Sequence, residues 1–329
     1  MTLASLGWTL ASLGWTPERQ HAFLQLPHDG VLPGRIVGEH RTHFQVAVAD
    51  KELAAIAPGA LRNGATQRSD LPGVGDFVAL RPASGDGPAT IEAVLPRTNA
   101  LIRKASGKLS PQLLAANIDT VFIVTGLDGD FNLARLERFL ALVRDSGAVP
   151  VILVNKIDLA TDVAVTTAQL VRAFPGVEVH AIGARAGHGI TGLAAYFQDN
   201  HTVALIGSSG AGKSTLINQL LGRAAQATGE VRGHDSRGRH TTTHRQLFLR
   251  PGGGMVIDTP GMRGLETWAA TEMDVQHYAD IEAIAATCRF RDCAHRTEPG
   301  CAIRAAVAAG TLDAGRVAAF LKPASESMR

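Results

Sequence analysis

The residues with the clearest chemical meaning form one run: Gly207, Ser208, Ser209, Gly210, Ala211, Gly212, Lys213, Ser214 and Thr215. This phosphate loop fits the pattern G-x-x-x-x-G-K-[ST], in which glycines let backbone N–H groups converge on phosphate oxygens. In such a loop Lys213 would reach the β- and γ-phosphates, and the Ser214 hydroxyl would ligate Mg²⁺. The run therefore predicts a site for a nucleotide and its magnesium ion.

A second motif, the base loop, consists of Asn155, Lys156, Ile157 and Asp158 and fits the pattern N-K-x-D. The carboxylate of Asp158 would accept hydrogen bonds from guanine N1–H and the guanine 2-amino group, and adenine offers neither donor there. This chemistry predicts a guanine nucleotide. The alternative is an exposed polar loop without a ligand.

About 25 residues after the base loop, Ile182-Gly183-Ala184-Arg185 occupies the place of a loop that backs the base. We refer to it as the backing loop. A serine and a lysine are usual at the positions of Gly183 and Arg185, so this motif is weak by itself.

Two further segments follow the phosphate loop. Residues 238–243, Gly-Arg-His-Thr-Thr-Thr, lie where a first switch would supply a threonine, assigned here to Thr241, to Mg²⁺ and the γ-phosphate. Residues 258–261 fit D-x-x-G, in which Asp258 would hold Mg²⁺ and the Gly261 N–H would sense the γ-phosphate. Many GTPases place a water-orienting glutamine next, but the residue here is Met262, which cannot do this.

All three cysteines of the chain lie within fourteen residues, and one histidine lies among them: Cys288, Cys293, His295 and Cys301. Three thiolates and one imidazole form a closed tetrahedral set that suits structural Zn²⁺. Four protein ligands leave no open coordination position, so catalysis by this metal is not expected. The alternatives are three reduced cysteines beside a chance histidine, or a redox pair, which the absence of C-x-x-C disfavours.

Alternating strands and helices must position the nucleotide motifs. Apolar runs predict strands at 120–125, 150–154, 177–182, 202–206 and 255–257, with helices predicted at 133–143, 163–174, 190–197 and from residue 216. Continuous apolar strands separated by helices predict a parallel sheet covered on both faces. Because ligands bind at the carboxyl ends of such strands, we expect the base loop and the phosphate loop at one sheet edge.

The N-terminal third has a different pattern. Residues 3–9 and 10–16 repeat the same seven letters, LASLGWT, and predict a weak N-terminal segment without an assigned role. Short alternating runs at 34–37, 42–48, 75–80 and 89–95 predict a small barrel of the OB type, which either binds RNA or is purely structural. Arg97, Arg103, Lys104 and Lys108 then form a basic connector, which is interpreted as a solvated linker; the alternative is that it contacts a phosphate backbone.

Composition bounds the function further. The 329 residues carry a net charge of +2, but residues 203–261 hold seven basic and three acidic side chains. This local excess favours an anionic ligand near the phosphate loop. No apolar run is long enough to span a membrane, and no secretory leader is recognisable, so we expect a cytoplasmic chain.

Together these motifs resemble the circularly permuted, small-subunit-dependent ribosomal GTPases of the RsgA/YjeQ family. The order is distinctive, because the base loop precedes the phosphate loop, whereas it comes last in an ordinary GTPase. The resemblance spans roughly residues 30–322 and implies a multidomain α/β chain. The implied parts are an N-terminal extension (1–30), an OB-like RNA-binding barrel (31–98), a circularly permuted P-loop GTPase domain (99–265) and a helical zinc-binding domain (266–329).

The same resemblance implies the activity and the partners. The chain would hydrolyse GTP to GDP and phosphate, using Mg²⁺, when stimulated by the small (30S) ribosomal subunit late in its assembly. Its partners would be that subunit, 16S rRNA and assembly factors, and the chain would be a monomer carrying one structural Zn²⁺. The family also points to His240 as the replacement for the missing glutamine; the alternative is that His240 contacts RNA or the switch backbone.

Two other functions remain open from the sequence. The chain could be a nucleotide-gated RNA-binding module in which hydrolysis only resets the gate. It could also be an ATPase with an unrelated substrate, which Asp158 argues against. We expect helices beside the zinc ligands at 272–287, 301–309 and 313–321.

Overall fold

A computed structural model describes residues 9–27, 29–103, 111–128, 131–160, 162–222, 245–259, 279–290, 293–295, 298–312 and 317. The chain divides into two compact units, Met1–Leu265 and Glu266–Arg329, and each is described by itself. Within the described residues, no helix combines the length and the apolarity needed to cross a bilayer.

The centre of the first unit is a parallel sheet with the strand order β10-β9-β8-β11-β13. Its strands are β8 (Thr120–Gly126), β9 (Val149–Asn155), β10 (Glu178–Ala181), β11 (Thr202–Gly207) and β13 (Met255–Asp258). Its helices are α3 (Leu133–Ser146), α4 (Val163–Ala173), α5 (Lys213–Leu221) and the 3-10 helices η4 (Ile157–Leu159) and η5 (Thr191–Asn200). The predicted strands and helices of this region are confirmed.

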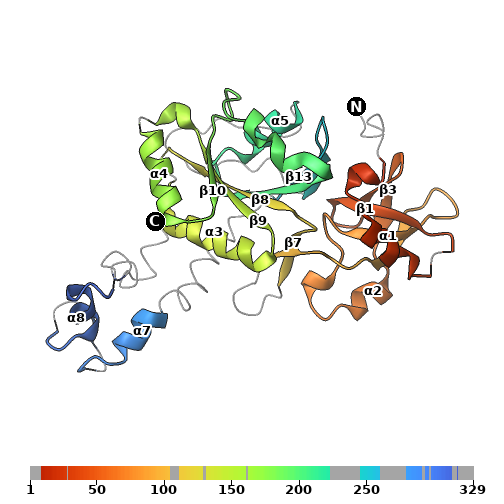
Figure 1. Cartoon of the computed structure of the whole chain (residues 1–329). Helices are drawn as coiled ribbons and strands as arrows, with labels where there is room; N and C mark the ends of the chain where they lie inside the picture. The colour runs from red at the N-terminus through yellow and green to blue at the C-terminus, as the bar shows by residue number, and fades with distance from the viewer. Residues whose placement is uncertain are drawn as a thin grey trace. The chain divides into compact units, whose positions relative to one another are not determined.

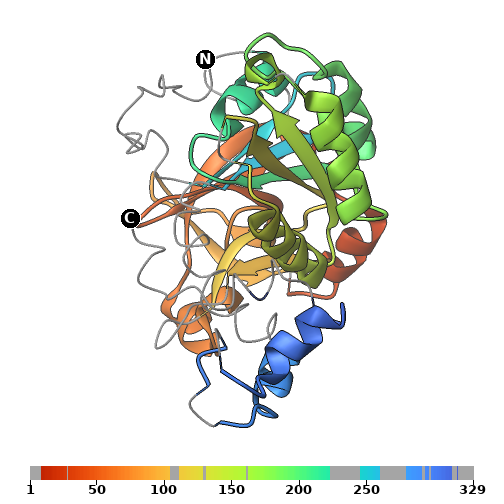
Figure 2. The same cartoon turned by 90° about the vertical axis from the view of Figure 1, so that its left-hand side faces the viewer.

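Both faces of the parallel sheet are buried, as continuous apolar strands require. Alternate residues such as Phe122, Leu153 and Leu205 form one core with the apolar sides of η5 and α5. The intervening residues face the other way, where α3 packs on β8 and β9 and α4 packs on the edge strand β10 (Figures 1 and 2). The sheet is therefore rigid behind its carboxyl edge, where the base loop and the phosphate loop begin.

The N-terminal part of this unit is a closed barrel. Its strands are β1 (Leu32–Glu39), β2 (Phe44–Val48), β3 (Lys51–Ile56), β4 (Phe77–Arg81) and β5 (Ala89–Val94). They run in the order β1-β2-β3-β5-β4, and β4 pairs with β1 to close the ring. Short helices α2 (Gly59–Gly64) and η3 (Arg68–Asp70) lie between β3 and β4. The predicted barrel is confirmed, and β3 is an additional strand that is not among the predicted ones.

The barrel and the parallel sheet are joined by backbone pairing. Strand β12 (Gln246–Leu249) is antiparallel to β13 on one side and to β1 on the other. At this β1–β12 seam Gly38 is the partner of Gln246, and Arg245 forms an ion pair with Glu39 at 2.9 Å. The two parts therefore form one continuous eleven-stranded sheet.

A buried arginine stabilises the packing beside the β1–β12 seam. Arg35 of β1 is 1% exposed, and its guanidinium donates to the carbonyls of Gly75, Leu13 and Asn117 and to the sulfur of Met255. Burial without a directly paired carboxylate lowers the pKa of Arg35 to about 9. One side chain thus links the N-terminal segment, the barrel and β13.

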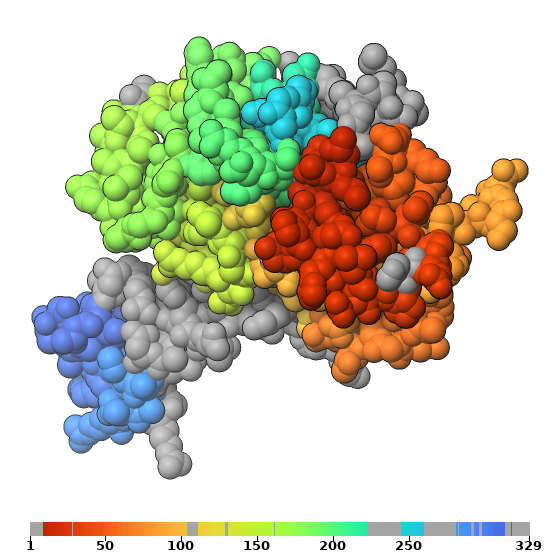
Figure 3. Space-filling model, turned by 45° about the vertical axis from the view of Figure 1, so that its right-hand side comes forward, coloured from red at the N-terminus to blue at the C-terminus, as the bar shows by residue number. Residues whose placement is uncertain are grey.

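The second copy of the heptad repeat is part of this packing. It contains η2 (Ala11–Leu13), and Thr16 caps α1 (Pro17–Leu24) by accepting from the Arg19 N–H. Leu13 is fully buried, and Trp15 packs edge-on against Phe77. In Figure 3 this segment, in red, lies against the cyan β12–β13 region. The prediction of a weak segment is wrong for this copy, and residues 3–8 of the first copy lie outside the described residues.

Arg97 does not belong to a solvated linker. Its guanidinium forms a bidentate ion pair with the fully buried Asp76, with N···O distances of 2.7 Å, and donates to the carbonyls of Ser69 and Leu71. Burial raises the pKa of the Asp76 carboxyl, and the bonds from Arg97 oppose that shift. Arg103 belongs to the hairpin β6 (Ala100–Arg103) and β7 (Gln112–Ala116), whereas Lys104 and Lys108 lie outside the described residues.

The second unit is small and helical. It contains α7 (Ala279–Ala285) and α8 (Ala302–Ala308), which fall within the ranges predicted at 272–287 and 301–309. Their apolar cluster includes Ile281, Cys301, Ile303, Leu312 and Val317. Of the helix predicted at 313–321, only Val317 is among the described residues, and it is helical.

Candidate nucleotide and metal sites

The phosphate loop connects β11 to α5, as the motif requires. Gly207 ends β11, Gly212 has a φ of +95°, and α5 begins at Lys213. The Lys213 ammonium donates to the carbonyls of Gly207 and Ser208 at 2.7 and 2.6 Å. The loop thus places a cation and the N–H groups of a helix start at one point, an arrangement that favours bound phosphate.

Asn155 ties three loops together. Its amide nitrogen donates to the Ala211 carbonyl in the phosphate loop at 2.8 Å, and its amide oxygen accepts from the Ala184 N–H in the backing loop at 3.0 Å. The side chain is buried, so both bonds are protected from water. The base loop, the phosphate loop and the backing loop therefore meet at one sheet edge, as predicted from their positions after parallel strands.

The other base-loop residues are less buried than Asn155. Lys156 has a φ of +65°, rare for a residue with a side chain, and it precedes η4, which carries Asp158. Asp158 is exposed, and no hydrogen bond or ion pair of its carboxylate occurs among the described residues. In the backing loop Gly183 and Ala184 are buried, whereas Arg185 is exposed. Asp158 thus offers a solvent-exposed carboxylate in the base loop.

Asp258 ends β13 at the same sheet edge, next to β11. It is 4% exposed, and this burial raises the pKa of its carboxyl to about 6, although the charge of Lys213 acts in the opposite direction. Burial makes the ionised carboxylate costly, and a divalent cation beside it would offset that cost, so Asp258 is a suitable oxygen ligand for a divalent metal. Ser214 lies in the first turn of α5 and offers a hydroxyl.

The remaining candidate residues of the switches, His240, Thr241 and Gly261, lie outside the described residues, as does Met262. The structure therefore brings together the base, backing and phosphate loops and Asp258, and leaves the switch residues as predictions.

An ion pair that is not predicted from the sequence lies beside the base loop. The Asp128 carboxylate forms an ion pair with the Lys156 ammonium, and the side chains are 28% and 19% exposed. The available signal was an acidic residue just after β8, the strand that pairs with β9.

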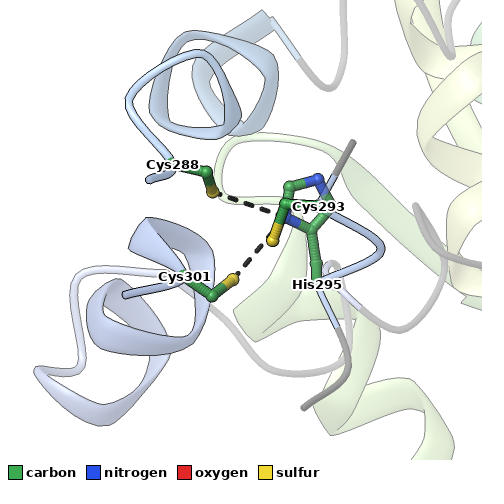
Figure 4. Close-up of side chains that lie close together, drawn as sticks. All are labelled: Cys288, Cys293, His295 and Cys301. Atoms are coloured by element: carbon green, nitrogen blue, oxygen red, sulfur yellow. Dashed lines mark hydrogen bonds between the residues drawn. The ribbon is translucent and has the colours of Figure 1, made fainter. Parts of the chain in front are cut away.

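The four candidate zinc ligands converge in the second unit, as Figure 4 shows. Nδ1 of His295 lies 3.5 Å from Sγ of Cys288 and 3.6 Å from Sγ of Cys301, and all four ligand atoms lie within 4.8 Å of one another. A tetrahedral zinc ion with ordinary Zn–S and Zn–N bonds separates its sulfur and nitrogen ligands by about 3.6 Å. The donor types and their spacing therefore fit Zn²⁺.

Comparisons with known proteins agree with this geometry. The profile of the RsgA GTPase family matches residues 94–268. The chain is 48% identical to a protein of Opitutus terrae named small ribosomal subunit biogenesis GTPase RsgA, over 98% of this chain and 89% of that protein. It is 44% identical to small ribosomal subunit biogenesis GTPase RsgA 2 of Lactiplantibacillus plantarum, over 89% and 83%.

Solved structures share the fold. YjeQ from Thermotoga maritima matches with a TM-score of 0.55 at 24% identity, covering 88% of this chain and 96% of that one. YloQ, described as a circularly permuted GTPase, matches with a TM-score of 0.53 at 26% identity, covering 90% and 94%. The description of YloQ agrees with the permuted order in which this chain carries the base loop and the phosphate loop.

Proposed function

The chain belongs to the RsgA GTPase family, and from this premise we propose that it is a GTPase of small (30S) ribosomal subunit biogenesis whose hydrolysis of GTP the subunit stimulates. It binds the subunit through 16S rRNA late in assembly, acts beside assembly factors as a monomer, and works in the cytoplasm. The names of its relatives support the ribosomal role, and the local basic excess supports an RNA partner.

The observation that carries the nucleotide site is the double hydrogen bond of Asn155. It fixes the loop that would read the base against the loop that would hold the phosphates. In this site the phosphate loop surrounds the phosphates, with Lys213 neutralising their charge, and Asp158 accepts from the guanine edge. Ala184 and Arg185 back the base.

Ser214 and Asp258 would hold Mg²⁺, which would supply charge neutralisation at the phosphates. Thr241 and Gly261 complete this arrangement in the switches, and His240 orients the attacking water. In the second unit Cys288, Cys293, His295 and Cys301 hold one structural Zn²⁺, a role supported by the fit of their spacing.

Asp158→Asn is expected to lower the affinity for GTP about 100-fold and to raise that for xanthosine triphosphate. Asparagine can accept only one of the two guanine hydrogen bonds, and hydrogen bonds to charged groups contribute about 1.5–3 kcal/mol each. Competition of GTP, ATP and xanthosine triphosphate for the protein, before and after the substitution, measures this. Unchanged selectivity among the three would remove Asp158 from base recognition.

GTP hydrolysis is expected to be slow alone and faster with isolated small subunits, with less stimulation as salt rises, because phosphate contacts release counterions. His240→Ala should abolish most of the stimulation and leave the affinity for GTP within about twofold. Turnover measured with and without subunits, at several salt concentrations, tests both points.

His21→Ala, on the exposed side of α1, serves as the matched histidine control. No stimulation of the unmodified chain at any salt concentration would contradict the proposed function. Stimulation that persists in the His240 variant would contradict only the role of that residue.

A further inference from the structure

The chain after β8 folds over the base loop. The Leu127 N–H donates to the Asn155 carbonyl at 3.2 Å, and the next residue, Asp128, pairs with the Lys156 ammonium. The ion pair lies at the surface, with side chains 28% and 19% exposed, so it orients Lys156 more than it stabilises the fold. Two successive contacts therefore attach this short segment to the motif that would read guanine.

Gly126, the last residue of β8, has no side chain, and the ion pair of Asp128 and Lys156 lies in the space that a side chain there would fill. A Cβ atom on Gly126 would stand 2.5 Å from an Asp128 carboxylate oxygen and 3.4 Å from Cδ of Lys156. Its own φ is not in the left-handed region, so space rather than backbone conformation makes glycine suitable here. The lysine stem and the carboxylate thus both lie against the end of β8.

The position of β8 gives this arrangement a meaning for the ligand. In the sheet order, β8 lies between β9, which ends in the base loop, and β11, which ends in the phosphate loop. The stem of Lys156 therefore lies over the end of β8, between the strands that lead into the two loops. A nucleotide with its base at Asp158 and its phosphates at Lys213 must cross this edge.

We infer that Asp128 is a positioning residue for guanine-nucleotide binding. Its carboxylate holds the aliphatic stem of Lys156 across Gly126, and the base and the ribose of the nucleotide pack on that stem. Without Asp128 the ammonium turns toward water and the stem leaves this position. The inference rests on the proposed nucleotide site. It predicts an effect on the rate at which the nucleotide dissociates, more than on the chemistry at its phosphates.

Asp128→Asn is expected to raise the dissociation rates of fluorescent GDP and GTP analogues three- to tenfold. Asp145→Asn, on the exposed side of α3, is the matched control and should leave both rates unchanged. Gly126→Ala displaces the carboxylate without removing it, so it should also raise both dissociation rates. It provides a second test of the inference if Asp128→Asn does not fold.

A double-mutant cycle distinguishes positioning from general support of the loop. In a Lys156→Met background, Asp128→Asn should change the dissociation rates by less than 1.5-fold, because the stem no longer carries a charge to hold. A change as large as that in the unmodified background would overturn the inference, as would unchanged rates for both Asp128→Asn and Gly126→Ala.

The selectivity of Asp158→Asn is measured alongside. If that variant fails to change base preference, the proposed site itself is wrong. If it succeeds while the Asp128 variants behave like the control, only the present inference fails.

Discussion

Gly212→Ala is expected to abolish measurable guanine-nucleotide binding, with a loss of at least 100-fold in affinity. Gly212 has a φ of +95°, and a Cβ atom there would overlap the amide nitrogen of Asn155. The substitution therefore forces Asn155 away from the Ala211 carbonyl and separates the base loop from the phosphate loop. Titration calorimetry with GDP and GTP measures the loss, and circular dichroism verifies that the chain is folded.

The phosphate loop offers a matched control in Gly210→Ala. Gly210 has a similar φ of +84°, but no atom lies within 4 Å of the Cβ position. This variant carries only the backbone strain, about 1–2 kcal/mol, and should lose no more than about tenfold in affinity. Equal losses in the two variants would mean that strain alone, and not the Asn155 bridge, determines the effect.

Removal of the metal is expected to unfold the second unit and leave the first intact. Structural zinc contributes about 10–16 kcal/mol to the folding of small domains, and the apolar cluster around Cys301 is too small to replace it. Cys301→Ser or His295→Ala should lower the zinc content from one per chain to nearly none. Limited proteolysis should then cleave the chain after about residue 265.

The control for these variants is again His21→Ala, which should retain one zinc and resist the protease. Full zinc content in both ligand variants would contradict the assigned ligand set. A protease-resistant second unit without zinc would show that its apolar cluster is sufficient.

The parts of the fold that could be predicted are those with a local signal. Continuous apolar runs such as 150–154 indicate buried parallel strands, and their shared carboxyl edge predicts where Asp158 and Lys213 meet. Strand β12 carries no such signal in four residues, Gln246–Leu249, because its place depends on pairing with Gly38. Such long-range pairing has no local pattern in the sequence.

The roles of charged side chains with partners far away in the sequence could not be predicted either. Arg97 looked like part of a basic linker, and only the structure shows that Asp76, 21 residues earlier, neutralises it in a buried site. The role of Asp128 likewise cannot be predicted from the sequence, because it depends on the pairing of β8 with β9. Arg35 gave no signal at all, since its partners are backbone carbonyls and a sulfur from four separate regions.

The β1–β12 seam also limits the order in which a newly made chain can fold. The barrel strands are close in sequence and can assemble as soon as they are synthesised. Gly38, in contrast, can pair with Gln246 only after more than half of the chain has followed it. Arg35 waits longer still, for Met255. Until then the edge of β1 lacks its partner strand, although the base loop and the phosphate loop have both been synthesised. Completion of the seam is therefore a late step, and contacts so distant in sequence are slow to form.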